Sequence, residues 1–290
     1  RRPEWYNACM VRARAIRTET IVLRQQVFGE ADRLVTLLTP DRGKLRAIAK
    51  GVRRPSSRKG GHLDLFMRSD VVLALGRNLD IITQAQILES YLALRDDLLR
   101  STYASYCVEL LDSFTPEGET NHELYWLLAD TLSHLSGSNN LSLITRYYEL
   151  HLMELAGFRP ELERCLGQGE RVQPEDQYFD PLVGGVLCSR CGSQRKGAGP
   201  ISMEALRLMR FMQRSPYGAV ANLRVRPNVV TELERTHLRY ITMQLERQLK
   251  SVDFLERVRR SSISDAAIIT GVPTPVREAN PARQTDPVAE

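Results

Sequence analysis

Eight basic residues lie between positions 42 and 59, and no acidic residue stands among them. Like charges at this density repel one another unless an anionic partner neutralises them. A run of charged residues is, however, most often part of a solvent-exposed surface without a partner. Lys and Arg side chains neutralise phosphates whatever the base sequence. We therefore predict a segment that binds nucleic acid, made of Arg42, Lys44, Arg46, Lys50, Arg53, Arg54, Arg58 and Lys59.

The same segment alternates between charged and apolar side chains, which predicts a strand with a cationic outer face. Side chains on a strand point to opposite faces in turn, so Lys44, Arg46 and Lys50 should share the solvent side. The glycine-flanked stretch 51–61 then reads as a flexible basic loop. Aromatic residues for base stacking are few, with Phe28 as a candidate and Phe66 more typical of a core. The apolar row of the strand should face inward: Leu45, Ala47 and Ala49.

Three cysteines have part of the spacing of a zinc ribbon. A ribbon needs two Cys-x-x-Cys knuckles about 20 residues apart to surround the metal with four thiolates. Cys188 and Cys191 form one knuckle, but Gln168 stands where the second cysteine of the Cys165 knuckle should be. We expect either one structural zinc ion on this incomplete site or a ribbon-shaped hairpin without metal. A carboxylate would have to complete the site: Glu170, Asp176 or Asp180.

A second group of basic residues follows the cysteines. It is a further candidate surface for an anionic partner, unless its arginines only cover core side chains with their aliphatic stems. This second basic surface is predicted to comprise Arg195, Lys196, Arg207, Arg210 and Arg214.

Motifs of the common enzyme classes are missing. Gly43-Lys44 does not have the spacing of a phosphate-binding loop, and the metalloprotease, hydrolase and dinucleotide signatures are absent. Paired acids such as Asp96 and Asp97 are usually solvated. We therefore expect a protein that is not an enzyme and uses no nucleotide.

The charge is distributed unevenly along the 290 residues. Residues 1–90 hold 17 basic and 9 acidic side chains, residues 91–180 hold 6 and 16, and residues 181–250 hold 12 and 4. This pattern favours binding of a polyanion by the two basic regions, 1–90 and 181–250, rather than by the whole surface. No run of about 18 apolar residues could span a bilayer, so we expect a cytoplasmic protein with no membrane partner.

Hydrophobic periodicity predicts an α+β protein. Five short β-like segments precede position 90, as in a small OB-type barrel, and helical periodicity follows. Patterned sequence begins near Met10, which we take as close to the natural start. The expected organisation is an extension at 1–11, an OB-fold barrel at 12–90, a helical domain at 91–160, a zinc-ribbon-like insert at 161–198, the helical domain continued at 199–260, and a disordered tail at 261–290.

Several stretches resemble the bacterial RecO family of DNA repair proteins. The likeness is carried by GEADRLVTLLTP at 29–40, GKLRAIAKGVRR at 43–54, GRNLD at 76–80 and LAGFRP at 155–160. The resemblance implies an OB barrel, a helical domain and a zinc-ribbon-like insert. It also implies that the basic barrel segment contacts DNA, and that Cys165, Cys188 and Cys191 match three of the four zinc cysteines. Gln168 departs from the pattern.

The resemblance further implies function and partners. Members of this family bind single- and double-stranded DNA, anneal complementary strands, and act with RecR to load RecA onto DNA coated by the single-strand-binding protein SSB. The acidic C-terminal tail of SSB would suit the second basic surface. Two other readings remain open, a protein-protein adaptor that contacts DNA only incidentally and an RNA-binding OB protein without annealing activity. The family would place the protein at the nucleoid.

Overall fold

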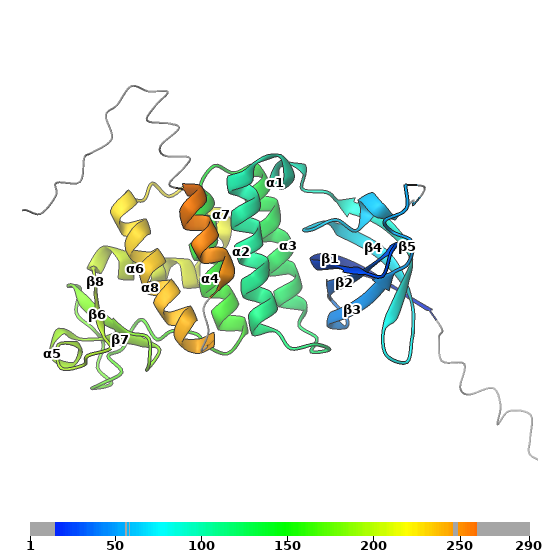
Figure 1. The fold of residues 1–290 in the computed structure, drawn as a ribbon. Helices are drawn as coiled ribbons and strands as arrows, with labels where there is room; N and C mark the ends of the chain where they lie inside the picture. The colour runs from blue at the N-terminus through cyan, green and yellow to red at the C-terminus, as the bar shows by residue number, and fades with distance from the viewer. Residues whose placement is uncertain (1–14, 56, 58, 246–248, 260–290) are drawn as a thin grey trace, which may run out of the picture.

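The computed structural model describes residues 15–55, 57, 59–245 and 249–259. The expected extension at 1–11, the tail at 261–290 and the basic residue Arg58 lie outside these residues. A barrel and a small three-stranded sheet lie at opposite ends of the molecule, with a body of helices between them (Figure 1). The α+β class predicted from the sequence is confirmed.

The N-terminal unit is a closed five-stranded barrel with strand order β1-β2-β3-β5-β4. β3 pairs with β5 in parallel, and the other pairs are antiparallel, as in the OB fold. Alternate side chains of each strand fill the interior, among them Val35, Ala47 and Val71. The strands are β1 (Ala15–Phe28), β2 (Asp32–Thr39), β3 (Gly43–Ala49), β4 (Arg68–Ala74) and β5 (Asp80–Glu89).

The turn between β2 and β3 touches the helical body directly. Gly43 has a φ of +62°, and a Cβ atom there would lie 1.9 Å from the backbone oxygen of Glu119. Only glycine allows both this left-handed backbone and so close an approach. The neighbouring Gly118 donates its backbone N–H to the carbonyl of Lys44 at 2.8 Å. The barrel is thus seated against the loop that joins the second and third helices.

The helical body buries one continuous apolar core. Asn121, Asn140 and Ser202 each cap a helix by accepting a backbone N–H through the side chain, which fixes where these helices begin. Asp97 does the same and separates a short first helix from the second. The helices are α1 (Leu92–Asp96), α2 (Leu98–Phe114), α3 (His122–Gly137), α4 (Leu141–Leu155), α6 (Met203–Arg214), α7 (Tyr217–Ala221), α8 (Pro227–Leu245) and a helical segment at 250–259.

A buried polar centre joins α2, α4 and α8. Glu149 of α4 lies 2.9 Å from the guanidinium of Arg146 and 2.8 Å from Nδ1 of His237, and it accepts the hydroxyl of Tyr106 at 2.6 Å. Burial acts to raise the pKa of Glu149, but Arg146 and the hydrogen bond from His237 outweigh it, and the pKa lies below its usual value. The carboxylate therefore stays charged inside the core.

The insert after α4 forms a small sheet with strand order β7-β6-β8. It consists of β6 (Gln177–Asp180), β7 (Gly185–Leu187) and β8 (Gly199–Ile201), with the single-turn helix α5 (Ser189–Gly192) between the last two. Among the helices of the described residues, none combines the length and apolar character needed to cross a membrane.

Candidate nucleic-acid interface and metal cluster

The outer face of β3 is covered at one end by the helical body. Leu45, Ala47 and Ala49 pack toward the barrel interior, as the alternation predicts. Lys44 lies on the opposite face but is only 8% exposed. Its Nζ donates to the Asp112 backbone carbonyl at 2.8 Å and to Oδ1 of the Asp112 side chain at 2.7 Å. The predicted solvent exposure of Lys44 is therefore wrong, because the end of α2 packs onto this face.

Other cations of the segment are paired with acids that lie far away in the sequence. Arg46 forms an ion pair with Glu117 at 2.8 Å, and Arg42 forms one with Asp80 at 3.0 Å. Both arginines remain partly exposed. The expectation that the eight charges are uncompensated is thus incorrect, since the fold supplies carboxylates that the segment itself lacks.

The loop after β3 carries the cations that remain available. Lys50 and Arg54 are exposed and form no ion pair with another described residue. Arg53 is also exposed and donates to the carbonyl of Glu30 at 3.1 Å, while Lys59 donates to the carbonyl of Ile82 at 3.0 Å. Neither contact neutralises a charge. These four cations form what we call the loop cations: Lys50, Arg53, Arg54 and Lys59.

The base of this loop is fixed beside the β1–β2 turn. The backbone N–H of Gly51 donates to Asp32 at 2.7 Å, and that of Arg53 donates to Ala31 at 3.0 Å. Phe28 at the same turn is 44% exposed, whereas Phe66 is buried in the core as its surroundings suggested. An exposed ring beside free cations is an arrangement suited to a single strand, since bases stack and phosphates pair with charge.

A groove of about 480 Å³ crosses the outer face of β4 and was not foreseen from the sequence. Val72 forms its floor between Arg17 of β1 and Gln84 of β5, which are its partners in the sheet register. Gln86 and Lys59 also line it, so the groove reaches one of the loop cations, Lys59. Gln84 and Gln86 occupy alternate positions of β5, as polar residues do on any solvated strand face. The sequence alone therefore does not predict this groove.

The residues of the second basic surface are mostly tied to acids. Arg210 and Arg214 of α6 both pair with Glu163 of the insert, Arg210 at 3.3 Å. Arg195 pairs with Asp180 at 2.9 Å. Burial lowers the pKa of Arg210, and its Nε donates to the carbonyl of Leu162. Arg210 and Arg214 thus hold the insert against α6, whereas Arg195 joins two parts of the insert itself. Within the part of the chain that the structure describes, two members of the set are exposed and have no ion pair: Lys196 and Arg207.

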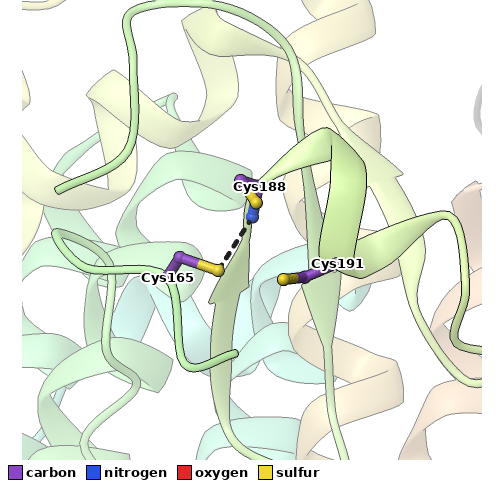
Figure 2. Close-up of side chains that lie close together, drawn as sticks. All are labelled: Cys165, Cys188 and Cys191. Atoms are coloured by element: carbon purple, nitrogen blue, oxygen red, sulfur yellow. Dashed lines mark hydrogen bonds between the residues drawn. The ribbon is translucent and has the colours of Figure 1, made fainter. Parts of the chain in front are cut away.

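The three cysteines converge in the insert, with their sulfur atoms within 4.8 Å of one another (Figure 2). Cys165 is buried, and the backbone N–H of Cys188 points at its sulfur from 3.3 Å. Burial acts to raise the pKa of Cys165, but this N–H and those of Gly167 and Gln168 lower it below the ordinary value. The cluster can bind a metal ion, because thiolates are the ligands that soft and borderline metals prefer.

The carboxylates that were expected to complete this site lie elsewhere. No histidine, aspartate or glutamate of the described residues joins the three sulfurs. Asp180 is paired with Arg195, and Asp176 accepts the backbone N–H of Met203 at the start of α6. Gln168 is the polar side chain at the cluster, with Oε1 3.8 Å from the sulfur of Cys188.

Comparisons with known proteins identify the same family over most of the chain. The family described as "Recombination protein O N terminal" matches residues 13–91, and "Recombination protein O C terminal" matches residues 95–253. This chain belongs to the RecO family. RecO family identity gives it a role in DNA repair and recombination.

Individual relatives are similar over most of this chain and most of their own length. The DNA repair protein RecO of Roseiflexus sp. (strain RS-1) is 39% identical over 250 residues, which cover 86% of this chain and 88% of that protein. The DNA repair protein RecO of Dehalococcoides mccartyi (strain ATCC BAA-2266 / KCTC 15142 / 195) is 34% identical over 257 residues, or 88% of this chain and 100% of that protein. The RecO of Symbiobacterium thermophilum is 38% identical over 243 residues, or 82% and 96%.

Proposed function

We propose that this protein is a non-enzymatic recombination mediator that binds single- and double-stranded DNA at the nucleoid and anneals complementary strands. The observation that carries the proposal is the group of loop cations on the barrel, beside the exposed ring of Phe28. Their charges are not neutralised by described acids, in contrast to those of Lys44 and Arg46. Phosphates are the anions that such a loop would attract along a strand.

Annealing by such a surface needs no bond chemistry. Two complementary strands repel through their phosphates, and this repulsion slows the first base pairs. Cations that neutralise the backbones lower that barrier, provided that the base edges stay free. A loop at the edge of a barrel contacts a strand from one side only, which suits this role.

The test is strand annealing with purified protein and two complementary labelled oligonucleotides, with and without SSB. The proposal expects faster annealing in both conditions and a strong decrease as salt rises. Binding of RNA without annealing of DNA would instead identify an RNA-binding protein. Absence of DNA binding at near-physiological salt would identify an adaptor.

The partners proposed by family resemblance are RecR, RecA through RecR, and the acidic C-terminal tail of SSB. A groove of about 650 Å³ between the insert and α8 supports the last of these. Leu182, which is 72% exposed, lines this groove together with Met243 and Arg239. Apolar walls beside an arginine suit a peptide that carries both apolar and acidic side chains. Arg239 also donates to the carbonyl of Gly197, so the groove adjoins Lys196 of the second basic surface.

This assignment is tested by fluorescence anisotropy with a labelled peptide of the SSB tail. Met243→Glu places a negative charge in the groove and should weaken binding by roughly tenfold or more, equivalent to about 1.4 kcal/mol. Arg207→Ala, on an exposed position of α6, is the control and should bind as the unaltered protein does. Equal loss in both variants would place the tail on the wider basic surface rather than in the groove.

A further inference from the structure

The cysteine cluster is built as a metal-binding knuckle, although one of its four cysteines is missing. A Cβ atom on Gly167 would lie 2.7 Å from the sulfur of Cys191 and 3.6 Å from that of Cys165. The backbone between Cys165 and Gln168 therefore wraps closely around the sulfurs, and only glycine leaves the space that they need. The N–H of Cys188 that points at Cys165 suits a thiolate there. A hairpin that merely retained the shape of a ribbon would require neither feature.

The fourth corner of the cluster holds no strong ligand. Gln168 is neutral, and its Oε1 is 3.8 Å from the sulfur of Cys188. An amide oxygen is a hard and weak donor for zinc, in contrast to a thiolate or an imidazole. Asp180, one of the expected substitutes, has an almost fully buried side chain that pairs with Arg195.

We propose that Cys165, Cys188 and Cys191 bind one zinc ion through three thiolates and leave the fourth coordination position open to a ligand from outside the chain. Structural zinc sites are closed by four protein ligands, whereas sites with three protein ligands hold water or another small ligand in the fourth position. The bound ligand is water when nothing else is present, and it is a small thiol or imidazole when one is supplied. The zinc is then exchangeable, unlike that of a closed four-cysteine ribbon.

Half-burial of two of the cysteines makes this position reachable. Cys188 and Cys191 are partly exposed, and only Cys165 is buried in the core of the insert. A ligand of the size of imidazole can therefore approach from the side of Cys188 and Cys191. This inference concerns the insert alone and does not depend on whether the barrel binds DNA.

Cobalt(II) is the probe for the test, because its visible absorption bands report the number and type of ligands at a zinc site. The full chain is reduced, freed of metal and titrated with cobalt, and imidazole or 2-mercaptoethanol is then added. An open position predicts one cobalt per chain with sulfur charge-transfer bands, followed by a saturable shift of the ligand-field bands. Bands that do not move with either ligand would show that the position is closed, and failure to bind cobalt would overturn the proposal entirely.

Three variants give matched controls. Gln168→Cys restores the fourth thiolate, so its bands should be insensitive to added ligand. Its zinc should resist a competing chelator more strongly, by at least the roughly 10- to 100-fold that outer-shell partners of metal ligands contribute to affinity. Gln168→Ala should behave as the unaltered protein does, and a changed cobalt spectrum would instead make Gln168 a ligand. Gly167→Ala should lose the metal, and circular dichroism and binding to DNA show whether the rest of the chain stays folded.

Discussion

Nζ of Lys44 in β3 lies 2.7 Å from the Asp112 carboxylate in α2, and this ion pair fastens the barrel to the helical body. Arg24 of β1 approaches the same carboxylate at 3.4 Å. A lysine in a basic strand thus serves the contact between two parts of the fold. Its role in stability and the role of the loop cations in binding can be separated by substitution.

Lys44→Ala should destabilise the protein by about 1–3 kcal/mol, because it removes the enclosed donor of the Asp112 carboxylate and leaves only the longer, more exposed contact with Arg24. Denaturant unfolding monitored by circular dichroism measures the change. Arg46→Ala is the control, because its ion pair with Glu117 is half exposed and such pairs contribute about 0–1 kcal/mol. Equal stability of the two variants would contradict the buried role of Lys44.

Replacing Lys50 and Arg54 together by alanine should weaken DNA binding to every sequence while the fold persists, since exposed substitutions change stability by about 0.5 kcal/mol or less. Each lost phosphate contact should reduce the slope of log K against log salt by about 0.7 for a single strand, or about 1.4 for the pair. The double variant Lys196→Ala and Arg207→Ala removes the same charge at the other end of the molecule. An equal change of slope in both would show that net charge, rather than the loop, determines binding.

The buried carboxylate of Glu149 should make stability depend on pH in the acid range. Its pKa is lower in the folded state than in the unfolded state, so its contribution is complete above the unfolded value of about 4.5 and is lost as the pH falls toward the folded value. Glu149→Gln should be less stable at pH 7 by about 3–5 kcal/mol, because Arg146 is left buried without its partner. Urea unfolding at pH 7, 5, 4 and 3 should show this difference shrinking below about pH 4.5. A difference that stays constant with pH would contradict the charged state of Glu149.

Gly43→Ala should be more harmful than Gly29→Ala, although both glycines have nearly the same backbone conformation. Their φ angles are +62° and +65°, so both substitutions incur the left-handed strain of about 1–2 kcal/mol. Only at Gly43 would the new Cβ also meet the Glu119 backbone, whereas the space around Gly29 is open. Thermal unfolding of the two variants measures the difference, and equal melting temperatures would show that the contact between the barrel turn and the body is dispensable.

Local patterns in the sequence predicted the elements well, because they follow from side-chain periodicity. The period-two alternation in the barrel placed Leu45, Ala47 and Ala49 inside, and it also put Lys44 on the correct face of β3. The burial of that face could not be predicted, since Asp112 is 68 positions further along the chain. The break at Asp97 also has no signal in the periodicity, because the apolar period continues across it while the cap interrupts the backbone.

The candidate sites were predicted unevenly for a similar reason. The spacing of Cys165, Cys188 and Cys191 was enough to predict that they meet, because a zinc ribbon brings together two knuckles about 20 residues apart. The arginines of α6 looked free in the sequence, but Arg210 and Arg214 meet Glu163 of the insert. Tertiary contacts determine which charges remain unpaired. The number of charged residues along the chain gives no information about those contacts.

Substitutions at the two ends of β3 should produce different phenotypes in cells, because the two ends have different surroundings. Lys44 is enclosed by the helical body, whereas Lys50, just beyond the other end of the strand, faces solvent. In a screen for cells that are sensitive to DNA damage, substitutions near position 44 should appear as low protein abundance, because a loss of 1–2 kcal/mol is about enough to change cellular levels several-fold. Substitutions at positions 50 and 54 should appear at normal abundance, and overexpression should rescue the first class more readily than the second.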